Sequence, residues 1–214
     1  MWAAAVKVAI CIPTFGDVKA GFVSSLARMI PATLASVRGL EMDTFIAHGS
    51  ILVQARTSLF GWARDWGADR ILWLDADHVF PADALVRLLL WRQPMVGANY
   101  PRRHDALVPT ALAADGQGGW RLVESSAQKA AAQPLEAVDR IGLGLALMDV
   151  ATVLQAVTAA GRPLFETRAH ADGTIEGEDW LLCDLLRAHG VPIHVDHALS
   201  RATGHIRDQP LFFA

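Results

Sequence analysis

Short apolar runs alternate with segments of helical periodicity along the first half of the chain. The runs are too short for helices and predict strands over residues 6–12, 44–47, 71–74 and 94–98. Between them, apolar residues recur every three or four positions and predict helices over residues 22–37 and 52–66, with a further helix opened by Pro81. Pro31 lies inside the first helix and should kink or split it. This alternation predicts an α/β fold with a doubly wound sheet.

The second half is patterned differently. Further strands are predicted over residues 108–112, 120–123, 138–147 and 191–195. The third of these is interrupted by Gly142 and Gly144. Helices are expected over residues 149–160 and 178–189, and the charged segment between them is expected to be a loop. No repeat or linker divides the chain, so its 214 residues are expected to form a single domain.

An Asp-Ala-Asp sequence directly after the predicted strand 71–74 is the first candidate for chemistry. Residues two apart in an extended chain point the same way, so Asp75 and Asp77 face one crevice at the carboxyl end of that strand, where α/β sheets bind ligands. Two carboxylates so close repel each other, and a divalent cation such as Mg²⁺ removes that penalty. The pair indicates a metal or phosphate site. The alternative is that both residues only turn the chain and start a helix.

Two further acids, Glu178 and Asp179, begin the last predicted helix. In one interpretation their charges only complement the helix dipole. In the other, an ionised carboxylate beside a second acid is placed to take a proton from an alcohol, and the helix N-terminus keeps it charged. His205, one of eight histidines, gains a role only as a further ligand for a metal already held by Asp77.

Composition narrows the classes of protein. The hydrophobic fraction is 52% and charged residues make up 19%, which allows a large core and excludes a disordered chain. The net charge of −3 gives no surface-wide attraction for nucleic acid or anionic membrane. Cys11 and Cys183 have no metal-binding spacing and fit a reducing compartment. No segment is long and apolar enough for a membrane span and no signal peptide is evident, so a cytoplasmic location is expected.

The motifs, in this order and spacing, resemble those of glycosyltransferases with the GT-A fold, close to glycosyltransferase family 2. Residues 8–14, Val-Ala-Ile-Cys-Ile-Pro-Thr, resemble the opening strand of that family. Residues 67–77 resemble its approach to the DxD motif, and residues 177–190 resemble its acidic "ED" helix. The resemblance implies a Rossmann-like, mixed and mostly parallel sheet flanked by helices. Its nucleotide-binding half would cover roughly residues 1–100, and its acceptor-binding half roughly residues 101–214.

The same resemblance implies roles for individual residues. The donor-binding residues would be Pro13, Thr14, Arg56, Asp75, Ala76 and Asp77. A divalent metal, Mn²⁺ or Mg²⁺, would be held by Asp77 and His205, with Asp75 at the metal or the donor ribose. Asp179 would be the catalytic base, with Glu178 beside it. The residues near the acceptor would be Gly142, Gly144, Arg102, Arg103 and Trp180.

The implied activity is transfer of a sugar from a UDP- or GDP-sugar to an acceptor hydroxyl, with inversion at the anomeric carbon. Phe15-Gly16 departs from the Tyr-Asn usual in the family. The segment 48–50 replaces an acidic residue that often contacts the base. The acceptor stays open between a glycan, a small molecule and a modified nucleobase. The residues Arg102, Arg103, Arg201 and Arg207 form either a basic rim for a phosphate-bearing acceptor or ordinary solvated surface.

Other classes of protein fit parts of the sequence. Asp75 and Asp77 match the nucleophile motif of a haloacid-dehalogenase-like phosphatase, for which Lys129 would have to serve as the downstream lysine. A nucleotidyltransferase has a related sheet, but the loop after the first strand lacks the usual Gly-rich, basic sequence. A non-catalytic nucleotide-sugar-binding module would leave Glu178 and Asp179 without a task. The sequence gives no indication of the oligomeric state.

Overall fold

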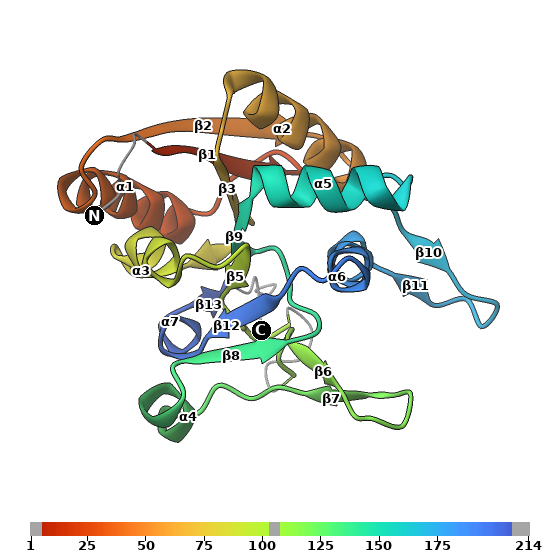
Figure 1. The fold of residues 1–214 in the computed structure, drawn as a ribbon. Coiled ribbons are helices and arrows are strands. Elements are labelled where there is room, and N and C mark those ends of the chain that lie inside the picture. Colours follow the sequence, from red (N-terminus) through yellow and green to blue (C-terminus); the bar gives the residue numbers. More distant parts are fainter. Residues whose placement is uncertain (1–5, 103–107, 207–214) are drawn as a thin grey trace, which may run out of the picture.

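A computed structural model describes residues 6–102 and 108–206. Within these residues a seven-stranded sheet has the strand order β2-β1-β3-β9-β5-β12-β8 (Figure 1). Its strands are β1 (Val6–Thr14), β2 (Leu40–His48), β3 (Arg70–Leu74), β5 (Met95–Gly97), β8 (Leu135–Val138), β9 (Leu145–Asp149) and β12 (Ile193–Asp196). The helices are α1 (Ala20–Ser36), α2 (Leu52–Trp66), α3 (Ala84–Trp91), α4 (Ala127–Ala132), α5 (Val150–Ala160), α6 (Glu178–Ala188) and α7 (His197–Arg201).

The sheet is mixed. β1 is parallel to β2 and β3, and β12 is parallel to β5. β9 is antiparallel to both β3 and β5, and β8 is antiparallel to β12. Hence β1, β2, β3, β5 and β12 run in one direction, and β8 and β9 run against them. The prediction of an α/β fold with a mixed sheet flanked by helices is confirmed at this level.

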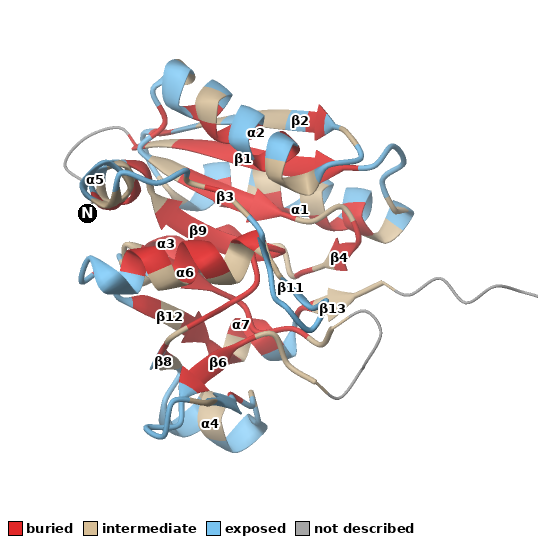
Figure 2. Ribbon diagram, turned by 90° about the vertical axis from the view of Figure 1, so that its right-hand side faces the viewer, coloured by how far each residue is buried: buried red, intermediate tan, exposed pale blue. Residues whose placement is uncertain are grey.

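Alternate residues of the central strands contribute to two cores, one on each face of the sheet. In β3, Ile71 and Trp73 pack in the core under α2, α5 and α6, whereas Leu72 and Leu74 pack in the core under α1 and α3. A strand covered on both faces has no polar side, which explains why its sequence is continuously apolar. Figure 2 shows the central strands buried and the outer surfaces of the helices exposed.

Two sequence predictions need correction. Of the two outcomes expected for Pro31, a kink or a split, the split does not occur, because α1 runs unbroken from Ala20 to Ser36 with Phe22 and Met29 buried. The single strand predicted over 138–147 is wrong. The chain forms the edge strand β8, then a link that contains Gly142 and Gly144, and then β9 between β3 and β5. Asp139 and Arg140 follow β8, and from Ile141 the sequence is apolar apart from the glycines, so only the glycines mark where β9 begins.

Three pairs of short strands complete the fold. They are β4 (His78–Val79) with β13 (Gly204–His205), β6 (Leu112–Ala114) with β7 (Trp120–Leu122), and β10 (Arg168–Ala169) with β11 (Ile175–Glu176). The last pair is a hairpin within a segment predicted to be a loop. The first pair sets His78 opposite His205 and so brings the end of the described chain beside the turn that follows β3. No helix in the described ranges combines the length and apolarity needed to cross a membrane.

Candidate functional site

Arg56 joins two motifs that lie far apart in the sequence. It projects from α2 into the protein, where its side chain is 2% exposed. Its Nη2 donates to Oδ1 of Asp75 at 2.9 Å, and its Nε donates to Oε1 of Glu178 at 3.0 Å. The Asp-Ala-Asp turn after β3 and the acidic start of α6 therefore meet at one guanidinium, as their assignment to a single site requires.

The two carboxylates also make the burial of Arg56 tolerable. Burial alone would lower the pKa of Arg56, but the charges of Asp75, Glu178 and Asp179 outweigh it and raise that pKa above its ordinary value. The guanidinium is therefore permanently charged. Its Nη1 is buried without a hydrogen-bond partner among the described residues, so one donor of this bridge is still unsatisfied.

Asp179 lies next to this bridge and is only partly exposed. Its Oδ1 accepts a hydrogen bond from its neighbour Trp180 N at 2.8 Å. Burial, followed by the charge of Glu178, raises the pKa of Asp179 to about 7, against the opposing charge of Arg56. A carboxyl group with that pKa takes up and releases protons near neutral pH, as a general base must.

Asp77 forms a second cluster with His78 and His205. His205 Nε2 lies 3.2 Å from Oδ2 of Asp77, and His78 Nδ1 lies 3.3 Å from Oδ1 of the same carboxylate. One potential ligand atom from each residue lies within 4.8 Å of the other two. An imidazole–carboxylate set at this spacing fits a divalent cation. Asp75, which was predicted to join the metal, is not part of this group and turns one oxygen to Arg56.

His78 and Tyr100 were not among the site residues predicted from the sequence. His78 is fully buried, stacks on His205 with ring centroids 4.5 Å apart, and meets the edge of Tyr100 at 4.2 Å. Burial is the main cause that lowers the pKa of His78 to about 4, so the ring is neutral. The hydroxyl of Tyr100 accepts from Gly144 N at 2.7 Å. The only feature of the sequence that could have identified His78 is its position directly after Asp77.

The predicted donor-binding residues Pro13 and Thr14 end β1. Thr14 lies opposite His48 of β2 in register, so the carboxyl ends of these two strands adjoin. The hydroxyl of Thr14 accepts from Gly16 N at 3.2 Å and fixes the start of the following loop. Lys19 N, at the end of that loop, donates to the carbonyl of Ala76 at 3.2 Å. This loop is thereby attached to the Asp-Ala-Asp turn.

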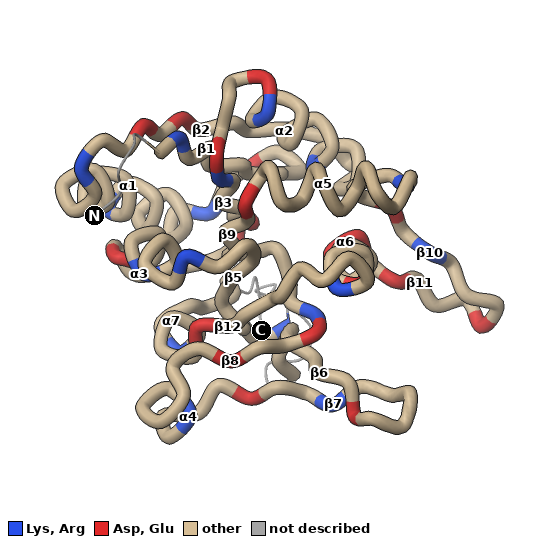
Figure 3. The backbone as a smooth tube through the Cα atoms, viewed as in Figure 1, with Lys and Arg blue, Asp and Glu red and all other residues tan. Residues whose placement is uncertain are grey.

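The predicted acceptor residues occupy neighbouring positions. The guanidinium of Arg102 lies 5.2 Å from the ring centroid of Trp180, so these two side chains form a cation–π pair. Gly142 and Gly144 pack against Tyr100, and an added Cβ at either position would overlap its hydroxyl. Arg103 and Arg207 lie outside the described residues. Figure 3 shows the basic and acidic residues interspersed along the chain.

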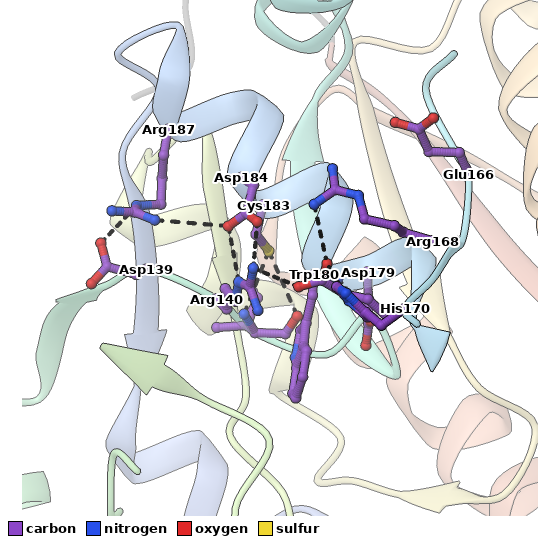
Figure 4. Close-up of polar contacts among 12 residues, drawn as sticks. Asp139, Arg140, Glu166, Arg168, His170, Asp179, Trp180, Cys183, Asp184 and Arg187 are labelled. Atoms are coloured by element: carbon purple, nitrogen blue, oxygen red, sulfur yellow. Dashed lines mark hydrogen bonds and ion pairs between the residues drawn. The ribbon is translucent and has the colours of Figure 1, made fainter. Parts of the chain in front are cut away.

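A network around Arg140 borders this region and was not predicted from sequence. Arg140 pairs with Asp184 of α6 and with Glu176 of β11, the latter at 2.7 Å (Figure 4). Its guanidinium lies 4.0 Å from the ring centroid of Trp120 and 5.3 Å from that of Trp180. The β10–β11 hairpin is thereby fastened to α6. Nothing in the spacing of these residues indicates their proximity.

Comparisons with known proteins give a structural likeness alone. No protein-family model matches the chain, and no curated protein matches its sequence. Among solved structures, the chain is similar to the crystal structure of A197 from STIV, with a TM-score of 0.51 and 13% sequence identity. The alignment covers 98% of each chain. At this identity the match shows a shared overall fold.

Proposed function

We propose that this chain is a metal-dependent glycosyltransferase of the GT-A type, similar to family 2, that moves a sugar from a nucleoside-diphosphate sugar to an acceptor hydroxyl. The observation that carries the proposal is the contact of Arg56 with both Asp75 and Glu178. Through this contact, an Asp-Ala-Asp turn at the carboxyl end of a central strand lies next to Asp179, a carboxyl group whose pKa suits a base.

The donor would lie across the carboxyl ends of β1 and β3. Pro13 and Thr14 would border the nucleotide, and Asp75 and Ala76 its ribose. Asp77 and His205 would hold a divalent cation, Mn²⁺ or Mg²⁺, with Asp75 nearby. When bound, that cation supplies Lewis-acid stabilisation of the negative charge that develops on the leaving diphosphate. Arg56 is already paired with two carboxylates through Nη2 and Nε, so its main task would be to hold Asp75 and Glu178 in place.

Asp179 would act on the acceptor. Its carboxylate takes the proton of the acceptor hydroxyl while the oxygen attacks the anomeric carbon from the face opposite the diphosphate. The bond from that carbon to the phosphate oxygen breaks, and its electron pair leaves with the diphosphate. The product has the inverted anomeric configuration. The Arg102–Trp180 pair adjoins Asp179 and would border the acceptor.

The phosphatase alternative requires Lys129 near the Asp-Ala-Asp turn, and Lys129 pairs elsewhere. Lys129 pairs with Glu136 of the edge strand β8, and His197 binds the same carboxylate at 2.8 Å. In the sheet, β9, β5 and β12 separate β8 from β3, which carries the Asp-Ala-Asp turn. Lys129 is thus committed elsewhere and cannot serve an aspartyl phosphate at Asp75.

A thermal-shift screen of nucleoside diphosphates and their sugars, with and without Mn²⁺, tests the proposal. We expect at least one nucleotide sugar to raise the melting temperature in the presence of the metal. Asp179→Asn should keep this shift but lower transfer or slow donor hydrolysis at least 100-fold, because the base is gone. The matched control is Asp65→Asn, which removes an exposed carboxylate on α2 and should leave turnover unchanged.

Three outcomes would contradict the proposal. The first is that no nucleotide or nucleotide sugar shifts the melting temperature with any divalent metal. The second is unchanged turnover in Asp179→Asn, which would remove Asp179 as the base. The third is hydrolysis of a generic aryl phosphate that depends on Asp75, which would restore the phosphatase interpretation.

A further inference from the structure

His78 has polar atoms for which the described residues offer no partner. The imidazole is fully buried, and although the backbone of Asp75 acts on the ring, neither ring nitrogen makes a well-aligned hydrogen bond within those residues. Buried polar groups are normally satisfied, because leaving them unpaired costs free energy. Nδ1 of this ring lies 3.3 Å from an oxygen of Asp77, but without the alignment of a hydrogen bond. A group that binds Nδ1 and the carboxylate of Asp77 together would satisfy this nitrogen.

His205 points to the chemistry of that group. Its Nδ1 lies 3.1 Å from the carbonyl oxygen of Pro101, which can only accept, and this contact requires the tautomer with the hydrogen on Nδ1. In the neutral ring Nε2 then has a lone pair, yet it lies 3.2 Å from an oxygen of Asp77. Two acceptors that face each other repel, and a cation between them turns that repulsion into two bonds. A histidine that binds a metal through one ring nitrogen usually donates the N–H of its other ring nitrogen to a carbonyl or carboxylate.

Protonation of His205 would relieve the same clash, but it would leave His78 as it is. His78 lies against both partners and has its ring fixed by Tyr100 on one side and by Gly144 beside Cε1. An added Cβ at Gly144 would lie 2.6 Å from that Cε1, so only glycine leaves room for the ring in this position. A cation would bind one nitrogen of each histidine with a single group.

We infer that His78 is a ligand of the divalent cation, together with Asp77 and His205. The inference rests on the cation of the proposed function and specifies its ligands. Two imidazole nitrogens and one carboxylate are a borderline donor set, which favours Mn²⁺, Co²⁺ or Zn²⁺ over Mg²⁺, an ion that prefers oxygen ligands. With three protein ligands, the cation would still be able to bind a further group such as a phosphate.

The test uses the full chain, freed of metal by a chelator and titrated with Mn²⁺ alone. Free Mn²⁺ is followed by its electron paramagnetic resonance signal, and Mg²⁺ is titrated as a competitor. We expect Mn²⁺ to bind at least tenfold more tightly than Mg²⁺. His78→Gln should weaken Mn²⁺ binding roughly 10–100-fold. His170→Gln, which alters an exposed histidine on the β10–β11 hairpin, should bind as the wild type does.

A second measurement needs no variant and holds even if His78→Gln fails to fold. Electron spin-echo spectroscopy of Mn²⁺ bound to the wild type should detect two histidine nitrogens. One nitrogen, or unchanged Mn²⁺ affinity in a folded His78→Gln, would overturn the inference and leave the transferase proposal standing. If Mn²⁺ binds through two nitrogens but no nucleotide sugar shifts the melting temperature, the assignment of His78 as a ligand stands and the transferase proposal is overturned. No Mn²⁺ binding at millimolar concentration would overturn both.

Discussion

Asp179 illustrates how one residue acquires chemistry from its surroundings. An aspartate in water titrates near 3.8, whereas burial and the adjacent charge of Glu178 raise the pKa of Asp179 to about 7. The same burial that makes the carboxylate basic makes it costly to ionise in the folded protein. Activity and stability should therefore respond to pH in opposite directions at this residue.

The rate should rise with pH. As the pH falls below about 7, Asp179 becomes protonated and can no longer take the proton of the attacking hydroxyl. The value of kcat/KM should therefore fall about tenfold for each pH unit below about 6.5. The measurement is the pH profile of kcat/KM with saturating Mn²⁺, because this ratio reports the pKa values of the free enzyme. A flat profile from pH 5.5 to 8 would contradict the role of Asp179 as the base.

Stability should fall with pH through the same range. Between 3.8 and about 7 the folded chain keeps the proton of Asp179, whereas the unfolded chain has lost it, so the stability that this proton provides is lost as pH rises. At about 1.4 kcal/mol per pKa unit, the penalty above pH 7 is at most about 4 kcal/mol. Asp179→Asn should accordingly melt several degrees above the wild type at pH 8, and the gap should close toward pH 4.

The control for this prediction is Asp65→Asn, because Asp65 is exposed on α2. Its melting temperature should follow that of the wild type at every pH. If Asp179→Asn melts below the wild type at pH 8, the carboxylate contributes a stabilising interaction and its pKa is not raised. Differential scanning fluorimetry of the metal-free proteins at pH 4, 6 and 8 is sufficient.

Sequence reasoning at the residue scale found the residues whose type and position carry a chemical signature. Asp75, Asp77, Glu178 and Asp179 stood out because carboxylates follow a buried strand and begin a helix. The structure then brought Asp75 and Glu178 together at Arg56. The importance of His78 could not be derived, because it depends on the approach of His205 from the other end of the chain.

At the scale of elements, Gly144 shows why the link before β9 leaves no room for a side chain. Its N–H donates to the hydroxyl of Tyr100, and a Cβ would lie 2.6 Å from Tyr100 Oη and from His78 Cε1. These neighbours are buried and fixed by one another, so they cannot move aside. Gly144→Ala should therefore destabilise the protein by about 1–3 kcal/mol, the typical cost of overpacking.

The matched substitution is Gly61→Ala. Gly61 lies inside α2, and a Cβ there would have no atom within 4 Å. Removing a flexible glycine from a helix should stabilise the protein by about 0.5–1 kcal/mol. Chemical denaturation of both variants measures the two shifts. If Gly144→Ala is as stable as Gly61→Ala, the contact between the glycine link and the two rings is not tight.

The predictability of the elements follows their length and periodicity. α2, α5 and β3 were located within a residue or two, because each has a long apolar stripe or a compact apolar run. The break at Gly142 and Gly144 was expected, but β8, with the sequence Leu-Glu-Ala-Val and one exposed residue, was not predicted to lie at the sheet edge, far from the buried strand β9. β4 and β13 contain two residues each, too few for any pattern, and tertiary contact alone defines them.

At the scale of the whole molecule, the candidate site combines both ends of the chain. Asp75 and Asp77 come from the first half, while Glu178, Asp179 and His205 come from the second. The order of these motifs in the sequence was compatible with a common site. It did not predict the strand order, in which β9 lies between β3 and β5. Long-range pairing of that kind depends on which strands find partners, and the local pattern does not encode it.

Because its ligands come from distant segments, a bound cation should stabilise the whole fold. Asp77, in the turn before β4, and His205, in β13, meet only in the folded chain, and the backbone N–H of Ile206 donates to the carbonyl of Asp77 at 2.7 Å. At 100 times its dissociation constant, Mn²⁺ should add about 2.7 kcal/mol to the free energy of unfolding. For a chain of this size that corresponds to a melting temperature about 5–10 °C higher.

Hydrogen exchange locates this stabilisation. β4 and β13 form a sheet of two short strands, so in the absence of metal their amides should exchange through local opening, well before those of β3. Since the cation has ligands on both sides of this pairing, Mn²⁺ should slow exchange in peptides that cover residues 76–80 and 203–206 together, and by a larger factor than in the edge strand β8. If Mn²⁺ raises the melting temperature but leaves both peptides unprotected, the metal binds elsewhere, and Asp77 and His205 are not its ligands.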